Sequence, residues 1–363
     1  MAGSYKDLNL DQDIVATRTL LHEQIPLTGT LASGTYGTFP NDTNVKNYSH
    51  GMFQSVYDYP YLSSSANHIY DLTVGYSPVS ALSGSGTQNT KKINLYNQMA
   101  QVLVGYDATG SIRKFDEDGD LTGGTKINEC IFVNFSRLLN KDEIKKGSFS
   151  LSIGTGSYGV PFSGRITIED TNAQNSYRVN SPAGEYGILS CSSGANIGTP
   201  SCGLIFYQAG VAVLSSSIFQ SASLGGILSD TSGSKAGLGL VDFGDVAGTS
   251  SINEVMVSSS ISGACDDLRH RIYDISYQNT TELNSTIHFC RLQSSDFNYS
   301  ANPTYLTGSK IRVKNTQTDS PVSYFTTVGL YSADNELLAI AKVSEPLKKT
   351  PANEMVLRVR LDY

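Results

Sequence analysis

The stretch Met355-Val-Leu-Arg-Val-Arg-Leu-Asp362 decides the fold class, because one of its two faces is apolar and the other is mainly charged. Successive side chains of a β-strand point to opposite faces, so this alternation predicts a strand that covers a core. The apolar face consists of Met355, Leu357, Val359 and Leu361. The chain is therefore expected to end inside a sheet.

Two further β runs precede this stretch, from Tyr324 to Tyr331 and from Glu336 to Val343. Ser332-Ala-Asp-Asn335 joins them, and Asp and Asn tolerate the left-handed backbone angles of a tight turn. The runs predict a hairpin that pairs with the last strand. The side chains expected to face inward from the hairpin are Val328, Leu330, Leu338 and Ile340.

Strand patterns dominate from Ile127 onward, while helical patterns are few and short. The predicted fold class is mainly β, an antiparallel β-sandwich with a few short helices. Its sandwich domain spans 126–363, with a Gly/Ser-rich insertion near 215–260. The strands are expected at 128–135, 147–153, 164–169, 187–190, 204–207 and 211–214. Helical segments are expected at 14–23, at 90–103 with Thr90 as N-cap, at a capping box of 140–143, and at 265–275.

Residues 1–65 show little periodicity and are predicted to form an extended N-terminal arm, followed by a strand and an amphipathic helix in 66–125. Tyr57, Tyr59 and Tyr61 would share one side of an extended segment, and Pro60 keeps that segment out of a central strand. The arm would dock on a neighbouring subunit. The alternative is a sheet edge or loop packed on its own domain.

Composition favours strands and turns. Only 16% of the 363 residues are charged, Tyr is abundant at 21 and Trp is absent. The net charge is −7, and basic residues form isolated pairs such as Lys91-Lys92 rather than a cluster. A surface that grips phosphates needs clustered Lys and Arg, so no direct nucleic-acid partner is expected.

The polar N-terminus lacks a basic stretch followed by an apolar run, and no window of the sequence is apolar enough for a membrane span. The protein is expected to be made in a cytoplasm and to stay soluble until it assembles. The five cysteines lack a CxxC spacing, which argues against zinc and thioredoxin-like sites. Cys191 and Cys202 could form a disulfide or could be small buried apolar residues.

The motifs of catalysis and cofactor binding fail on inspection. Gly154-Thr-Gly-Ser-Tyr-Gly159 matches a dinucleotide fingerprint, but Val160-Pro-Phe162 follows where a helix is required. Asp116-Glu-Asp-Gly-Asp120 resembles the start of a calcium loop, yet Leu121 and Ile127 replace its Gly and Glu. No HExxH, GxSxG or Walker motif occurs. We therefore predict a non-enzymatic protein with no catalytic, cofactor or metal residues and no small-molecule substrate.

The C-terminal hairpin resembles a pattern common in tailed-phage structural proteins, on Asn302-Pro-Thr-Tyr305, Ser323 to Tyr331 and Asn335 to Lys342. Similar stretches occur in baseplate, collar and fibre-attachment proteins of contractile-tailed phages. The run from Phe53 to Gly75 is also similar to proteins of phage structural gene clusters. The resemblance implies a virion component and implies no catalytic residue.

The expected function is that of a bacteriophage virion structural subunit, of the tail, baseplate or neck-collar, that assembles as a ring in the host cytoplasm. Its expected partners are copies of itself and other virion proteins. One alternative is a capsid-associated or decorating protein. Another is a receptor- or glycan-binding β module, which the absence of Trp and of a fibre-like repeat disfavours. The interface candidates are Tyr57, Tyr59, Tyr61, Arg358 and Arg360.

Overall fold

The structure, a computed structural model, describes residues 5–28, 43–84, 86–156, 160–192, 201–219, 227, 256–257, 259–300, 304, 306–307, 310–311, 316 and 318–363. The chain divides into two compact units: unit 1 is Met1–Leu20 with Glu282–Tyr363, and unit 2 is Leu21–Thr281. The chain passes between them within β1 (Ile14–Thr28) and again within β15 (Ile272–Leu292).

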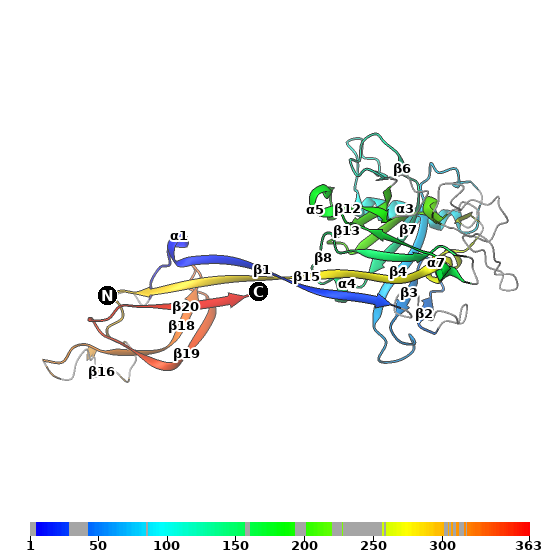
Figure 1. The fold of residues 1–363 in the computed structure, drawn as a ribbon. Helices are drawn as coiled ribbons and strands as arrows, with labels where there is room; N and C mark the ends of the chain where they lie inside the picture. The colour runs from blue at the N-terminus through cyan, green and yellow to red at the C-terminus, as the bar shows by residue number, and fades with distance from the viewer. Residues whose placement is uncertain are drawn as a thin grey trace. The chain divides into compact units, whose positions relative to one another are not determined.

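Unit 2 consists of antiparallel strands joined by turns and short helices (Figure 1). Its remaining elements are β2 (Val45–Asn47), β3 (Gln54–Tyr57), β4 (His68–Tyr76), α3 (Asn89–Leu103), β5 (Phe115–Asp116), β6 (Lys126–Ile127), β7 (Glu129–Phe135), α4 (Arg137–Asn140), β8 (Glu143–Ile144), β9 (Ser150–Gly154), η1 (Pro161–Ser163), β10 (Arg165–Glu169), α5 (Ala173–Ser176), β11 (Arg178–Ser181), β12 (Gly184–Ser192), β13 (Ser201–Phe206), β14 (Val211–Ser215), η2 (Ser216–Phe219) and α7 (Ile261–Arg271).

Most of these strands form one sheet in the order β1-β15-β9-β10-β12-β13-β14-β7-β4-β3-β2. Every strand pair with a defined register in this sheet is antiparallel, for example β4 with β7 and β13 with β14. The predicted fold class, mainly β with antiparallel strands and a few short helices, is confirmed. The strands expected at 128–135, 164–169, 204–207 and 211–214 are present with shifted ends.

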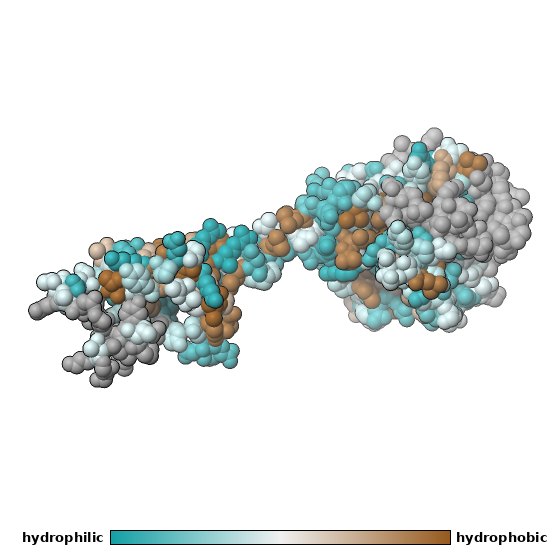
Figure 2. Space-filling model, turned by 90° about the horizontal axis from the view of Figure 1, so that it is seen from below, coloured by the Kyte–Doolittle hydropathy of each residue, from teal (hydrophilic) through white to brown (hydrophobic). Residues whose placement is uncertain are grey.

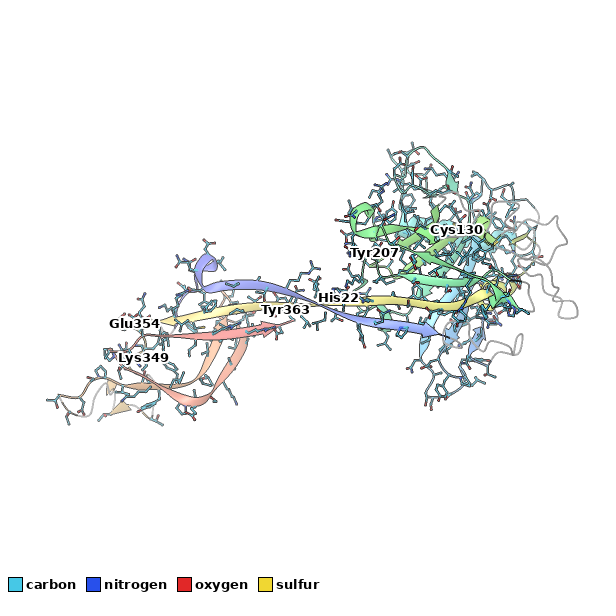
Figure 3. All side chains as sticks on the ribbon, viewed as in Figure 1. His22, Cys130, Tyr207, Lys349, Glu354 and Tyr363 are labelled. Atoms are coloured by element: carbon cyan, nitrogen blue, oxygen red, sulfur yellow. A yellow bond between two sulfur atoms is a disulfide. The ribbon has the colours of Figure 1, made fainter. Side chains whose placement is uncertain are left out.

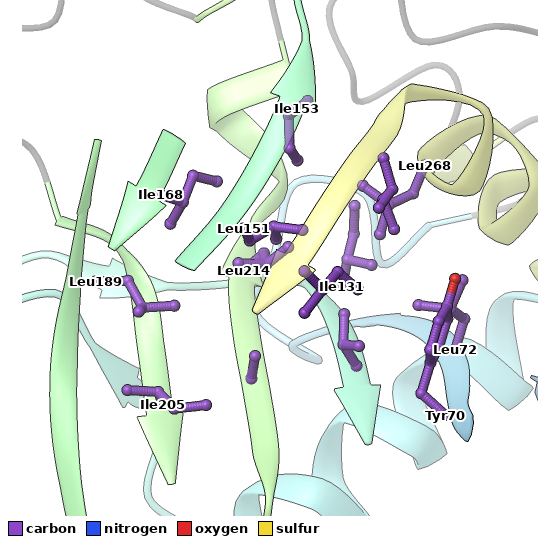
Figure 4. Packing of buried hydrophobic residues seen from close by; sticks show 14 of the residues in the cluster. Tyr70, Leu72, Ile131, Leu151, Ile153, Ile168, Leu189, Ile205, Leu214 and Leu268 are labelled. Atoms are coloured by element: carbon purple, nitrogen blue, oxygen red, sulfur yellow. The ribbon is translucent and has the colours of Figure 1, made fainter. Parts of the chain in front are cut away.

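The sheet curves around one hydrophobic core. The ring of Phe135, at the end of β7, lies 5.9 Å from that of Phe149 and 5.1 Å from that of Tyr277, between centroids. Phe149 directly precedes β9 and Tyr277 lies in β15, and β14, β13, β12 and β10 separate these strands from β7. Strands so far apart in a sheet can share contacts only when the sheet folds over. Side chains from β7, β9 and β14 meet in this core (Figure 4).

A second core lies on the opposite face of β7, β13 and β14, because alternate residues of each strand point the other way. Helix α3 covers it with Tyr96, Ala100 and Leu103. The helix packs closely on β4 at Gly75, where an added Cβ would lie 2.7 Å from the Lys92 carbonyl oxygen. Glycine is therefore required at this crossing.

Unit 1 contains the C-terminal strands that the sequence predicted. Its elements beside β1 and β15 are α1 (Leu10–Asp13), β16 (Leu306–Thr307), β17 (Lys310–Ile311), β18 (Ser323–Tyr331), β19 (Leu337–Lys349) and β20 (Met355–Asp362). The β18–β19 hairpin is present, and its turn holds Asn335 at a left-handed φ of 63°. However, β20 pairs with residues 285–292 of β15 and not with the hairpin, which corrects the predicted pairing.

A buried lysine connects the hairpin to the rest of unit 1. The Lys349 ammonium donates to the Asn298 Oδ1 atom at 2.8 Å, to the Thr350 carbonyl at 2.9 Å and to the Ser294 carbonyl at 3.2 Å (labelled in Figure 3). Three acceptors satisfy the three donors of an ammonium, which is the condition for burying it without a large desolvation cost.

The predicted N-terminal arm of residues 1–65 is wrong for the residues that the structure describes. Strands β2 and β3 belong to the main sheet, and Val45 and Val56 are part of its core. These strands are only three and four residues long, so they give little periodic signal. The boundaries expected at 65 and 125 also differ from the division at Leu20, Thr281 and their neighbours. The insertion expected near 215–260 lies mostly outside the described residues.

Three helix predictions are also corrected. Residues 14–23 lie in β1, where the β-branched Ile14, Val15 and Thr17 favour a strand over a helix. Asn140 ends α4 and Glu143 begins β8, so the residues 140–143 form no capping box. The last helix ends at Arg271, and β15 continues from Ile272.

Helix α3 is confirmed, but Gln88 and not Thr90 precedes it as the N-cap. The Gln88 side chain makes no cap hydrogen bond and instead accepts one from the Ile261 backbone at the start of α7.

Of the two alternatives for Cys191 and Cys202, the structure has the disulfide. They lie on the paired strands β12 and β13, with Cα atoms 6.2 Å apart. Within the described part of the chain, no helix is both long and apolar enough to span a membrane.

Replacement of Phe135 by Ala should destabilise unit 2 by about 3–5 kcal/mol, because it removes the ring that joins both sides of the folded sheet. Chemical denaturation of the purified protein measures the change. The control is Leu138→Ala, whose side chain is 65% exposed three residues away and whose loss should cost about 0.5 kcal/mol or less. Equal effects of both changes would contradict a core at this position.

Candidate interaction surfaces

The outer face of the β18–β19 hairpin exposes large apolar side chains. Leu338 is 69% exposed and Ile340 is 59% exposed, while Leu330 on the other face is 9% exposed. The prediction that Leu338 and Ile340 face inward is therefore wrong. Every residue of 337–341 is apolar, so the sequence pattern could not show which side chains face the core and which face solvent. The register decides it, because Leu330 pairs with Ala339, Tyr331 with Leu337, and Leu338 is the extra residue of a bulge.

Tyr331 and Leu337 lie on the same outer face as Ile340, next to Gly329. A Cβ added at Gly329 would lie 2.8 Å from the Tyr331 ring and 3.4 Å from Leu337, so both side chains cover this glycine. The Tyr5 ring meets the Tyr331 ring edge to face, at 5.1 Å between centroids. We call this surface the hairpin outer face, and it consists of Tyr5, Tyr331, Leu337, Leu338 and Ile340. Figure 2 shows hydrophobic side chains gathered on the surface of unit 1.

Strand β20 presents the two faces that its sequence predicted. Val359 is buried at 7% exposure, whereas Arg358 and Arg360 point to solvent. Arg360 is held within unit 1, because its guanidinium donates to the Asp362 carboxylate at 2.6 Å and to the Ser285 hydroxyl at 3.0 Å. Of the two arginines proposed as interface residues, Arg358 is thus the one whose side chain makes no hydrogen bond to the described residues.

A cluster of aromatic and histidine rings covers one surface of β2, β3, β4 and the segments between them. Tyr57 lies 5.6 Å from His68 and 6.5 Å from Tyr61, between ring centroids. Burial, with a hydrogen bond to Tyr48, raises the pKa of Tyr57 to about 12. This aromatic cluster consists of Tyr48, His50, Phe53, Tyr57, Tyr61 and His68.

The predicted row of three tyrosines on one extended segment is corrected. Strand β3 ends at Tyr57, and the Asp58 carboxylate accepts hydrogen bonds from the Asn67 backbone and side chain at 2.6 and 2.8 Å. The loop closed in this way brings Tyr61 back to Tyr57, while Tyr59 remains 60% exposed. The other members of the cluster were missed, because they come together only through the pairing of β2, β3 and β4.

Ser55, His68 and Asp71 lie together beside this cluster, but not in the order of a catalytic triad. The Ser55 hydroxyl donates to the Asp71 carboxylate, and His68 Nε2 contacts the same Asp71 oxygen at 2.8 Å. A triad needs the histidine between the serine and the carboxylate, where it can take the serine proton. Here Asp71 lies between the two groups, so the arrangement fixes β3 on β4 and His68 makes no hydrogen bond with Ser55.

The buried cysteines offer no nucleophile. Cys130 and Cys265 are fully buried, and burial raises the pKa of both thiols well above the ordinary value. A thiol must lose its proton to attack, and these surroundings oppose that loss. The glycine motif at 154–159 also has a structural role. The carbonyls of Gly154 and Gly156 accept hydrogen bonds from the buried Arg271, and only the single turn η1 follows.

Comparison of the chain with protein-family models, with curated proteins and with solved structures found no match.

Val359→Asp and Arg358→Ala should separate folding from interaction on one strand. A carboxylate at position 359 would be buried without a partner and should destabilise unit 1 by more than about 2 kcal/mol. Arg358→Ala should change stability by about 0.5 kcal/mol or less, because the side chain is in solvent. Urea denaturation and soluble yield measure both. Normal folding of the Val359 variant with collapse of the Arg358 variant would show that the faces are reversed.

Proposed function

We propose that this chain is a non-enzymatic structural subunit of a bacteriophage virion, which assembles with copies of itself in a ring of the tail, baseplate or neck-collar. The observation that carries the proposal is the hairpin outer face. Leu337, Leu338 and Ile340 belong to the same segment that resembles phage structural proteins, and they leave a large apolar surface in contact with water.

An exposed apolar cluster of this kind is typical of a site of interaction with another protein. Burial of one such side chain contributes about 1.5–3 kcal/mol, so Leu338 and Ile340 alone can stabilise a contact between subunits substantially. A second copy that covered the hairpin would also stabilise it. Two strands by themselves are marginally stable, and β18 and β19 hydrogen-bond only to each other among the described strands.

We propose a second copy of this chain as the occupant of the hairpin outer face, with other virion proteins on further surfaces. The aromatic cluster of unit 2 and Arg358 supply such surfaces. Tyrosine rings cover much area with few rotamers to lose on binding. The protein would be made in the host cytoplasm and would remain in the virion. Capsid association or decoration is the alternative location, and it would use the same surfaces.

Charge on the hairpin outer face should weaken self-association. Leu338→Asp combined with Ile340→Asp places two carboxylates in the proposed contact, so the variant should be monomeric at a concentration where the wild-type chain is oligomeric. The control is Val179→Asp, which charges a residue of β11 that is 68% exposed in unit 2. Size-exclusion chromatography with light scattering gives the masses.

Incorporation of each variant into particles should follow the same order. A wild-type chain that is a stable monomer, and that binds no virion component, would contradict the proposal. Oligomers that are unaffected by the double change but lost with Val179→Asp would place the contact on unit 2.

A further inference from the structure

The loop between β5 and β6 places three aspartates around one point. Asp116, Asp118 and Asp120 each offer a carboxylate oxygen, and these three atoms lie within 4.8 Å of one another. Oxygen atoms at such separations can share one Ca²⁺ ion, which takes 6–8 oxygen ligands at about 2.3–2.6 Å. Neither Leu121 nor Ile127 provides the expected Gly or Glu, so the sequence pattern alone argued against a site.

Asp116 differs from an ordinary surface aspartate in its burial and in its hydrogen bonds. Its side chain is fully buried, and its Oδ1 atom has no hydrogen-bond partner. The Asp116 Oδ1 and Asp118 Oδ2 atoms both line one point of the loop, since they lie 3.5 and 3.3 Å from the position of a Cβ added at Gly124. An unpaired buried carboxylate oxygen is costly, and a cation would satisfy it.

The loop is held in place from outside. Arg178 donates to the Asp118 carbonyl at 3.0 Å, Asn180 to the Gly119 carbonyl at 3.0 Å, and Tyr186 to the same carbonyl at 2.7 Å. Inside the loop, the Oδ1 atoms of Asp118 and Asp120 accept backbone hydrogen bonds two residues onward. These backbone hydrogen bonds use one oxygen of each carboxylate and hold both side chains in place. A fixed loop needs little reorganisation to bind an ion.

A cationic group already uses part of this set of oxygens. The Lys126 ammonium donates to the Asp116 Oδ2 atom at 2.7 Å and to the Thr122 carbonyl. A carboxylate and a backbone carbonyl are ligands that Ca²⁺ also prefers. One ammonium does not neutralise three clustered carboxylates, so the cluster keeps a net negative charge that would attract a divalent cation.

We propose that Asp116, Asp118, Asp120 and the Thr122 carbonyl form a Ca²⁺ site, in which the ion displaces the Lys126 ammonium from Asp116. Water completes the coordination. Lys126 competes with the ion, so the affinity is low, with a Kd of about 10⁻⁴–10⁻³ M. This site is independent of the proposed virion role.

Terbium luminescence tests the site on the full chain after treatment with a chelator. Tb³⁺ replaces Ca²⁺ at oxygen sites and is excited through nearby tyrosine. Tyr186 donates to Gly119 in this loop, and the chain has no Trp to compete as a sensitiser. The wild-type chain should sensitise Tb³⁺, and Ca²⁺ should displace it. Calorimetric titration with Ca²⁺ alone provides the second measurement.

The variants are chosen so that folding stays intact. Asp118→Asn and Asp120→Asn change exposed side chains and should each weaken Ca²⁺ binding about tenfold or more. Lys126→Met removes the competing ammonium and should tighten it about tenfold. Asp107→Asn is the matched control, because Asp107 is an exposed aspartate that accepts hydrogen bonds from Thr109 and Ser111 in a separate turn. Its binding should equal that of the wild type.

Absence of Ca²⁺ uptake by the wild-type chain up to about 10 mM would overturn the proposal. Uptake by Lys126→Met alone would overturn it as well, because the ammonium would then be a permanent replacement for the ion. Equal binding by Asp107→Asn and Asp118→Asn, both weakened or both unchanged, would show that Ca²⁺ does not bind in this loop.

Discussion

The contact of Phe135 with Phe149 and Tyr277 is the constraint on which the rest of unit 2 depends. It joins β7 to β9 and β15, which lie far from it in the strand order, and so keeps one sheet folded over one core. Because the sheet folds in this way, its middle strands have two buried faces. Helix α3 then covers the second face, and the exposed surfaces are confined to edges, loops and the short strands β2 and β3.

Buried charges fix how the helices lie on this sheet. Lys92 on α3 donates to the carbonyls of Met256 and Ser259, and burial lowers its pKa to about 8. On α7, Arg269 donates to the Asp266 carboxylate at 2.7 Å, and Gln54 of β3 donates to the same oxygen at 2.7 Å. Each group is costly to bury alone, so the packing must keep its partners in place. In unit 1, the buried Lys349 at the end of β19 likewise needs its acceptors Ser294, Asn298 and Thr350 in place.

The alternation of residues within single strands predicted much of the fold. It predicted little about which side chains are exposed or lie together at the surface. The alternation of Met355–Asp362 assigned the faces of β20 correctly, because one set of its residues is apolar and the other carries the arginines. The same reasoning failed for Leu338 and Ile340, where both alternations are apolar and the pairing with β18 decides. Nor could spacing bring Tyr57 and His68 together, since their contact depends on the register of β3 and β4.

In the proposal made above, the hairpin outer face is the surface through which copies of this chain would assemble. Its apolar side chains are exposed on the two-stranded β18–β19 sheet, which a neighbouring copy would cover. Cryo-electron microscopy of the intact particle tests this account most directly. The account predicts a ring of copies of this chain in which density from an adjacent copy covers Leu338 and Ile340. Particles without this chain, or copies whose hairpin outer face remains in contact with solvent, would contradict it.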